Sequence, residues 1–147
     1  MTSVAERTVR EARTWVGTPY RHQASQKGAG ADCLGLIRGV WRVLYGAEPE
    51  PVPPYSMDWS EPARDEVLWR AATRHLLPQE RGPLESGDVV LFRMRDRAVA
   101  KHLGLIGQTG ANPSFIHAYS GHGVLESPLS AAWRRRIVAR FTFPEEN

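Results

Sequence analysis

The chain has 147 residues, of which 41% are hydrophobic and 24% are charged, so it is long enough to bury a core. Its one cysteine cannot form an internal disulfide, which excludes a small disulfide-stapled scaffold. The net charge of +3 comes mostly from scattered arginines. Without a nucleic-acid motif, this excess favours a solvated basic surface and no nucleic-acid partner, with attraction to an anionic polymer as the alternative.

The amino-terminal segment MTSVAERTVREARTW lacks the apolar centre of a signal peptide. Uninterrupted apolar runs are all much shorter than a membrane span requires. We therefore expect synthesis in the cytoplasm without a signal peptide, and no membrane span. Export by another route stays open.

The first half of the chain predicts helices. Apolar residues recur at helical spacing over residues 4–16, and residues 18–31 form a small-residue loop. The strongest helical pattern runs from Cys33 to Leu44 and is closed by Gly46. A proline-rich connector follows over residues 47–62, and a weaker helical pattern runs from Glu61 to about Leu76.

The second half predicts strands separated by short turns. The strands are expected at residues 89–92, 102–107, 114–119, 124–129 and 137–143. Helices followed by strands indicate an α+β fold, in which amino-terminal helices pack on an antiparallel sheet of about four to six strands. We expect a single domain over residues 1–147, with a proline-rich and helical insertion at about 47–83.

Cys33 begins the strongest helix, directly after Asp32. If Asp32 is the N-cap, the thiol lies in the first turn, where free backbone N–H groups and the helix dipole stabilise a thiolate. Cys33 also shares the apolar stripe of Leu36, so a buried, inert cysteine is the structural alternative.

A thiolate nucleophile needs a base, and the base needs a group that orients it. His102 and His117 lie on consecutive predicted strands, and their imidazoles are neighbours if these strands pair. The same pair with Cys33 has the ligand types of a zinc site. However, the sequence contains no CxxC or HxxxH pair, so we expect no metal and no cofactor.

The remaining histidines carry weaker expectations. His75 in the connector helix and His122 in a tight turn are expected to be solvated, and His22 has no assigned place.

Five stretches in this order resemble the NlpC-type family of cell-wall cysteine peptidases, a papain-like group. They are residues 15–20 (WVGTPY), 31–36 (ADCLGL), 84–92 (LESGDVVLF), 101–106 (KHLGLI) and 115–118 (FIHA). The resemblance implies a papain-like α+β core. It also implies that Cys33 is the nucleophile, His102 the general base and His117 the residue that orients it. Tyr20 and Asp32 match positions beside the nucleophile, and the Tyr20 hydroxyl is expected to support the oxyanion hole.

The sequence departs from the family pattern at two places near the nucleophile. The common Asp-Cys-Ser-Gly signature is Asp-Cys-Leu-Gly at residues 32–35, and residues 21–25 (RHQAS) replace an aromatic residue and paired glycines. With the proline-rich Asp58-Trp59 region, these features are most similar to the branch found in phage tails and gene transfer agents.

The resemblance implies hydrolysis of an amide bond in peptidoglycan stem peptides, with the bond between γ-D-glutamate and a diamino acid as the expected one. It further implies tail or baseplate proteins as partners and a place in a phage-like particle that acts on the cell wall. The alternatives are a structural tail-tip or hub component with a silent site, and a cysteine amidase or acyltransferase on the same scaffold.

Overall fold

The computed structural model describes residues 3–52, 55, 66–80 and 82–145. The helices are α1 (Val4–Thr14), α2 (Cys33–Tyr45), α3 (Val67–His75) and α4 (Ala131–Arg135). The strands are β1 (Ser25–Gln26), β2 (Gly30–Ala31), β3 (Leu77–Pro78), β4 (Val89–Phe92), β5 (His102–Ile106), β6 (Ser114–Tyr119), β7 (Gly123–Pro128) and β8 (Ile137–Thr142).

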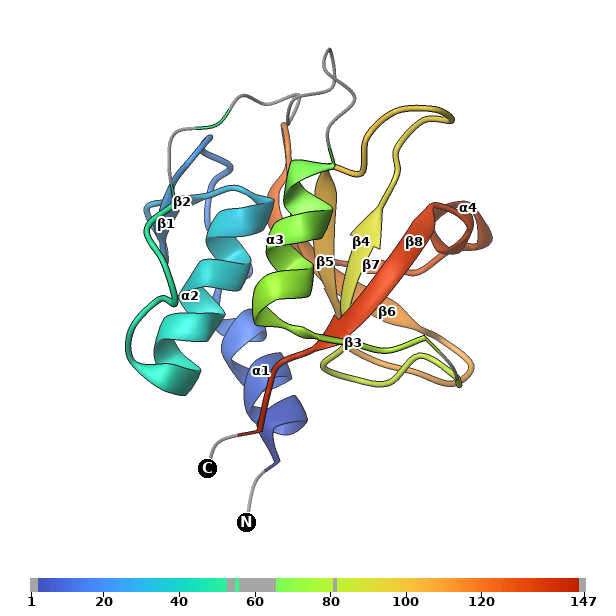
Figure 1. The fold of residues 1–147 in the computed structure, drawn as a ribbon, viewed down its shortest axis with the longest axis horizontal. Helices are drawn as coiled ribbons and strands as arrows, with labels where there is room; N and C mark the ends of the chain where they lie inside the picture. The colour runs from blue at the N-terminus through green and yellow to red at the C-terminus, as the bar shows by residue number, and fades with distance from the viewer. Residues whose placement is uncertain (1–2, 53–54, 56–65, 81, 146–147) are drawn as a thin grey trace.

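The main sheet has six strands in the order β3-β8-β4-β5-β6-β7, and each neighbouring pair is antiparallel. The first three helices lie on one side of this sheet and α4 on the other (Figure 1). The predicted α+β fold, with amino-terminal helices on an antiparallel sheet, is confirmed. The five long strands lie where their apolar runs predicted them.

Both faces of the central strands are covered, which explains their continuous apolar sequence. Val89, Leu91 and Leu105 belong to the core beneath α1, α2 and α3. The alternate residues Val90 and Phe92 belong to a second cluster, which Trp133 of α4 covers. Because the side-chain period of a strand is two, neither face of β4 is left for polar residues.

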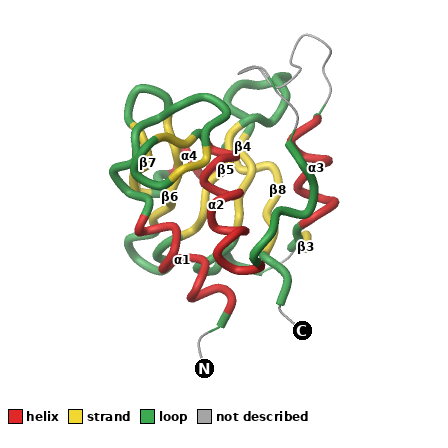
Figure 2. Tube along the Cα trace, turned by 90° about the vertical axis from the view of Figure 1, so that its left-hand side faces the viewer, coloured by secondary structure: helices red, strands yellow, loops and turns green. Residues whose placement is uncertain are grey.

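Helix α2 is the centre of the helical layer and lies against β5 and β6 (Figure 2). Its glycines explain how closely it packs. A Cβ on Gly39 would lie 2.0 Å from the Trp15 ring, and a Cβ on Gly35 would lie 1.8 Å from the carbonyl oxygen of Ala24. The loop before α2 therefore packs directly on the first turn of the helix, which fixes the place of Cys33.

Some boundaries differ from the predicted ones. Helix α1 ends at Thr14 with Trp15 as its C-cap, because the chain tightens into a turn before Gly17, whose φ is +97°. The predicted loop 18–31 contains the β1-β2 hairpin, whose strands have two residues each and carry no periodic signal.

The insertion predicted at about 47–83 contributes α3 to the helical layer and β3 to the edge of the sheet, beside β8. The predicted start of its helix at Glu61, and Asp58-Trp59, lie outside the described residues. The division into one domain with an insertion stays a prediction. Within the described ranges, every helix is too short or too polar to cross a membrane.

Candidate active site

Cys33 is the first residue of α2, and Asp32 is its N-cap, as predicted. The backbone N–H of Gly35 donates to Asp32 Oδ1 at 2.7 Å, and that of Gln23 donates to Oδ2 at 2.7 Å. The Asp32 side chain therefore ties the preceding loop to the first turn of the helix. This arrangement holds the thiol at the amino-terminal end of α2.

The two predicted site histidines are in contact. His102 Nε2 lies 2.8 Å from His117 Nδ1, and His117 Nε2 lies 2.9 Å from the Ser127 hydroxyl. Strands β5 and β6 pair next to each other, which confirms the expectation that these imidazoles are neighbours. Since Nε2 of His102 is engaged by His117, Nδ1 is the ring nitrogen left for a proton from the thiol.

Cys33 and His102 line one cleft of about 370 Å³, together with Tyr20 and Asp32. His22, which the sequence left without a place, lines it as well. His117 is 1% exposed and lies behind His102. The structure thus brings four of the five predicted residues to one cavity and places the fifth against the base.

The protonation state of the thiol differs from the sequence-based expectation. Burial, together with the carboxylate of Asp32, raises the pKa of Cys33 to about 12, although the backbone amides of Leu103 and Leu34 act in the opposite direction. The helix terminus favours a lower pKa, but this effect is outweighed because the thiol is buried near the negative charge of Asp32. In the free protein the thiolate-stabilising influence of the helix start, which the sequence indicated, is therefore the weaker effect on the pKa of Cys33.

The histidines are neutral for a related reason. Burial, with a smaller effect of His117, lowers the pKa of His102 to about 3, and burial lowers the pKa of His117 to about 4. Near neutral pH the cleft is therefore lined by a protonated thiol and an unprotonated imidazole. Such a pair makes the nucleophile by transferring the proton as the reaction begins.

The Tyr20 hydroxyl is also protonated near neutral pH. Burial, followed by the charges of Cys33 and Asp32, raises its pKa to about 12. Tyr20 can therefore donate a hydrogen bond into the cleft that it lines. Its part in an oxyanion hole stays a prediction.

An aromatic cover over the histidine pair was missed from the sequence. The Trp133 ring lies 5.7 Å from that of His102 and 5.3 Å from that of His117, measured between centroids. Helix α4, which carries Trp133, has five residues and is too short for a periodic signal. By excluding water from this face of the sheet, Trp133 contributes to the burial that keeps both imidazoles neutral.

A family model for the NlpC/P60 family matches residues 17–141. The chain belongs to the NlpC/P60 family. Murein DD-endopeptidase MepH of Escherichia coli K12 is 28% identical over 125 residues, which are 84% of this chain and 40% of that protein. The chain thus spans less than half the length of this curated relative.

Solved NlpC/P60 structures have the same fold. The NlpC/p60 domain of the peptidoglycan hydrolase SagA superposes with a TM-score of 0.63 at 17% identity, covering 95% of this chain and 98% of that domain. An NlpC/P60 family protein from Bacillus cereus ATCC 10987 gives a TM-score of 0.63 at 17% identity, covering 95% of this chain and 40% of its own.

In this NlpC/P60 chain, Tyr55 joins the proline-rich segment to Asp32, the residue before Cys33. The sequence did not single out Tyr55. The Tyr55 hydroxyl donates to Asp32 Oδ2. Its backbone carbonyl accepts from the Gln23 side chain at 2.7 Å and lies 2.8 Å from His22 Nε2. Tyr55 was missed because a lone tyrosine among prolines has no pattern that points to a partner 23 residues away.

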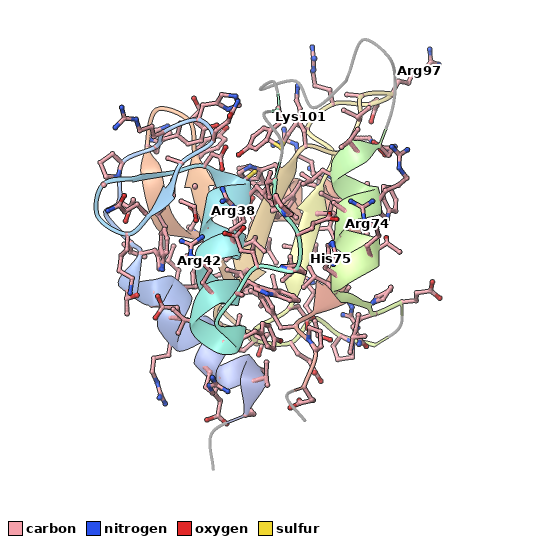
Figure 3. All side chains as sticks on the ribbon, turned by 60° about the vertical axis from the view of Figure 1, so that its left-hand side comes forward. Arg38, Arg42, Arg74, His75, Arg97 and Lys101 are labelled. Atoms are coloured by element: carbon pink, nitrogen blue, oxygen red, sulfur yellow. The ribbon has the colours of Figure 1, made fainter. Side chains whose placement is uncertain are left out.

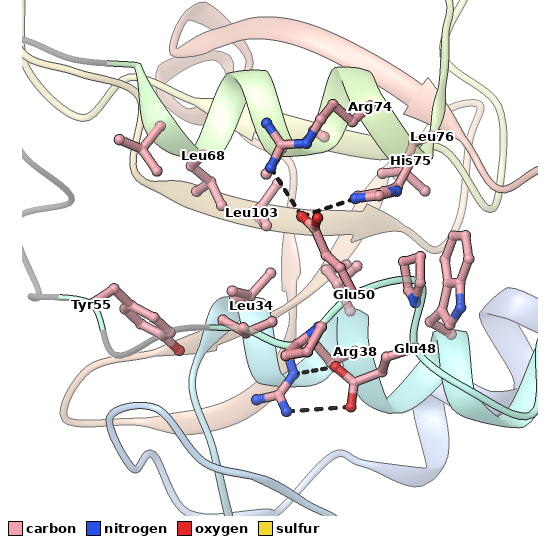
Figure 4. Close-up of a pocket in the computed structure, with 18 residues that line it drawn as sticks. Leu34, Arg38, Glu48, Glu50, Tyr55, Leu68, Arg74, His75, Leu76 and Leu103 are labelled. Atoms are coloured by element: carbon pink, nitrogen blue, oxygen red, sulfur yellow. Dashed lines mark hydrogen bonds and ion pairs between the residues drawn. The ribbon is translucent and has the colours of Figure 1, made fainter.

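A second cavity, of about 380 Å³, lies between α2, α3 and the segment that carries Tyr55. Figure 3 shows Arg38 and Arg42 extending from α2, with Arg74 and His75 across from them. At its edge Arg38 Nε donates to Glu48 at 2.6 Å, and Arg74 donates to Glu50 at 3.0 Å (Figure 4). These ion pairs hold residues 48–52 over the cavity.

His122 is exposed, as expected, and its ring stacks on that of Tyr119 at 5.4 Å between centroids. His75 is only partly exposed, and its Nε2 lies 3.1 Å from a Glu50 oxygen. Across the residues that the structure describes, no group of three or more His, Cys, Asp or Glu side chains is arranged to hold a metal ion.

Replacing Tyr55 with phenylalanine is expected to lower the free energy of unfolding by about 1.5–3 kcal/mol, because a buried carboxylate loses a hydrogen-bond donor. Tyr45→Phe is the matched control, since the Tyr45 hydroxyl donates to the neutral carbonyl of Pro144 and its loss should cost about 0.5–1.5 kcal/mol. Urea unfolding at pH 7 measures both. An equal or smaller loss for Tyr55→Phe would show that this bond does not stabilise the cap.

Proposed function

We propose that the protein is a cysteine endopeptidase that hydrolyses an amide bond in peptidoglycan stem peptides. The observation that carries the proposal is the cleft lined by both a thiol at a helix start and an imidazole whose Nε2 is hydrogen-bonded to a second imidazole. Membership in the NlpC/P60 family supports it. So do the names of two similar proteins, a peptidoglycan hydrolase and a murein endopeptidase.

The proposed reaction begins when His102 Nδ1 accepts the Cys33 proton as the sulfur attacks the substrate carbonyl. The oxyanion is stabilised by backbone N–H groups at the start of α2 and by the Tyr20 hydroxyl. His102 then returns the proton to the leaving amine, and water hydrolyses the acyl-enzyme. His117 accepts a hydrogen bond from Nε2 of His102 and stabilises the imidazolium that forms.

For the bond, we propose the link between γ-D-glutamate and the diamino acid of the stem peptide. A second candidate is a D,D bond between stem peptides, favoured by the name of the relative MepH. The two bonds differ in the peptides that cleavage releases, so product masses separate them.

For the setting, we propose the tail or baseplate of a phage or gene transfer agent, where the protein would meet the cell wall as part of a particle. The unusual residues 21–25 and the Asp-Cys-Leu-Gly sequence at 32–35 support this branch. The competing proposal is a structural tail component with a silent site.

Mass spectrometry of fragments released from purified peptidoglycan tests the activity. Wild-type protein is expected to release fragments cut within the stem peptide, and Cys33→Ala to release none. Transfer of the acyl group to an added amine in preference to water would indicate an acyltransferase. Equal release by the wild type and Cys33→Ala would contradict the proposal. So would the absence of released fragments with either protein, both alone and after mixing with host tail extract.

A further inference from the structure

The histidine pair is the middle of a longer chain of hydrogen-bonding groups. His102 Nε2 contacts His117 Nδ1 at 2.8 Å, and His117 Nε2 contacts Ser127 Oγ at 2.9 Å. Ser127 lies on β7, which pairs with the strand that carries His117. Both nitrogens of the neutral His117 ring are therefore engaged, one by an imidazole and one by a hydroxyl.

A neutral imidazole has one N–H donor and one acceptor nitrogen. The chain of contacts consequently permits two consistent proton arrangements. In the first, His102 Nε2–H donates to His117 Nδ1, and His117 Nε2–H donates to Ser127, which leaves His102 Nδ1 as an acceptor. In the second, Ser127 donates to His117, His117 donates to His102, and His102 Nδ1 carries a proton.

Only the first arrangement lets His102 act as a base toward Cys33, because a protonated Nδ1 cannot accept the thiol proton. The rings themselves are held by packing. His117 lies 4.1 Å from the Phe115 ring and 5.5 Å from the Tyr119 ring, between centroids. The two arrangements thus differ in the position of the proton and not in the orientation of the ring.

We propose that Ser127 is a positioning residue that accepts the hydrogen bond of His117 Nε2–H and thereby keeps His102 in the tautomer that accepts the thiol proton. The proposal rests on the proposed function, since it assigns Ser127 a role in that reaction. A serine hydroxyl suits the role because it accepts from a neutral ring without bringing a charge into the buried pair.

Nitrogen-15 NMR of histidine-labelled protein tests the tautomer directly. The wild type is expected to show His117 with a protonated Nε2 and an unprotonated Nδ1, and His102 with the same pattern. Ser127→Ala is expected to show averaged signals for His117, whereas Ser127→Thr keeps the hydroxyl and restores the wild-type pattern. A wild-type His117 protonated at Nδ1 would overturn the proposal.

Kinetics with stem peptide provide the second readout. Ser127→Ala is expected to lower kcat roughly fivefold to tenfold, about the effect of one hydrogen bond, with little change in KM. Ser127→Thr should recover most of the rate. Ser114→Ala is the matched control, because this hydroxyl of the same sheet bonds to Glu126 and not to a histidine. An unchanged kcat in Ser127→Ala contradicts the role.

The two readouts separate this proposal from the proposed function. The tautomer is measured without substrate, so it is obtained even if the protein cleaves no stem peptide. Hydrolysis that requires Cys33 together with a tautomer insensitive to Ser127→Ala would overturn the role of Ser127 alone.

Discussion

Replacement of His102 by alanine is expected to lower kcat/KM for stem-peptide hydrolysis by about 10³–10⁴-fold at pH 7. The reason lies in the protonation state of the nucleophile. Burial and the Asp32 carboxylate raise the pKa of the Cys33 thiol to about 12, so at pH 7 only about one thiol in 10⁵ ionises unaided. Without the acceptor nitrogen of His102, the attacking thiolate has to come from that small population.

The pH dependence of the residual activity identifies the cause. The His102→Ala variant is expected to gain rate about tenfold per pH unit over pH 7–9, since hydroxide ionisation of Cys33 replaces proton transfer to the imidazole. His75→Ala is the matched histidine control, because His75 pairs with Glu50 beside the other cavity, and it should keep the wild-type rate. A His102→Ala protein with a tenth of the wild-type activity would show that another group is the base.

How much of the site could be predicted depends on how local the signal is. Cys33 and its cap Asp32 are adjacent in the sequence. The helical pattern after them and the small residues before them were therefore sufficient to predict that Asp32 caps a helix that begins at Cys33. The contact between His102 and His117 followed from two apolar runs joined by a short turn, since consecutive strands with such a turn usually pair. Those parts depend on neighbours in the chain.

The unpredicted parts come from contacts between distant segments. Tyr55 reaches Asp32, and Trp133 covers the histidines, through the packing of short elements whose own sequences have no periodicity. The raised pKa of Cys33 has the same origin. A helix start alone predicts a lowered value, whereas burial of the thiol in the folded chain, with the carboxylate of Asp32, raises it.

Acid is expected to destabilise the folded protein at pH values well above those at which its carboxylates titrate. Burial, with a smaller effect of His117, lowers the pKa of His102 from 6.5 to about 3, and burial, with a smaller effect of His122, lowers that of His117 to about 4. In the unfolded chain both regain ordinary values. Between the lowered pKa values of the folded protein and pH 6.5, the unfolded state binds more protons than the folded state. The stability contributed by the two neutral histidines is therefore fully present above pH 6.5 and is lost as the pH falls below it.

The free energy of unfolding from urea titrations at pH 7.5, 6.5, 5.5 and 4.8 measures this loss. Below pH 6 it should fall by about 1.4–2.7 kcal/mol per pH unit, the limits for one or two groups. Glu48 and Glu126, whose pKa values are lowered by arginine partners, contribute only at more acid pH. A His102→Gln, His117→Gln double variant should flatten the slope. A wild-type free energy that stays constant from pH 7.5 to 4.8 would mean that the buried imidazoles accept protons without unfolding, and that the neutral pair is not a property of the fold.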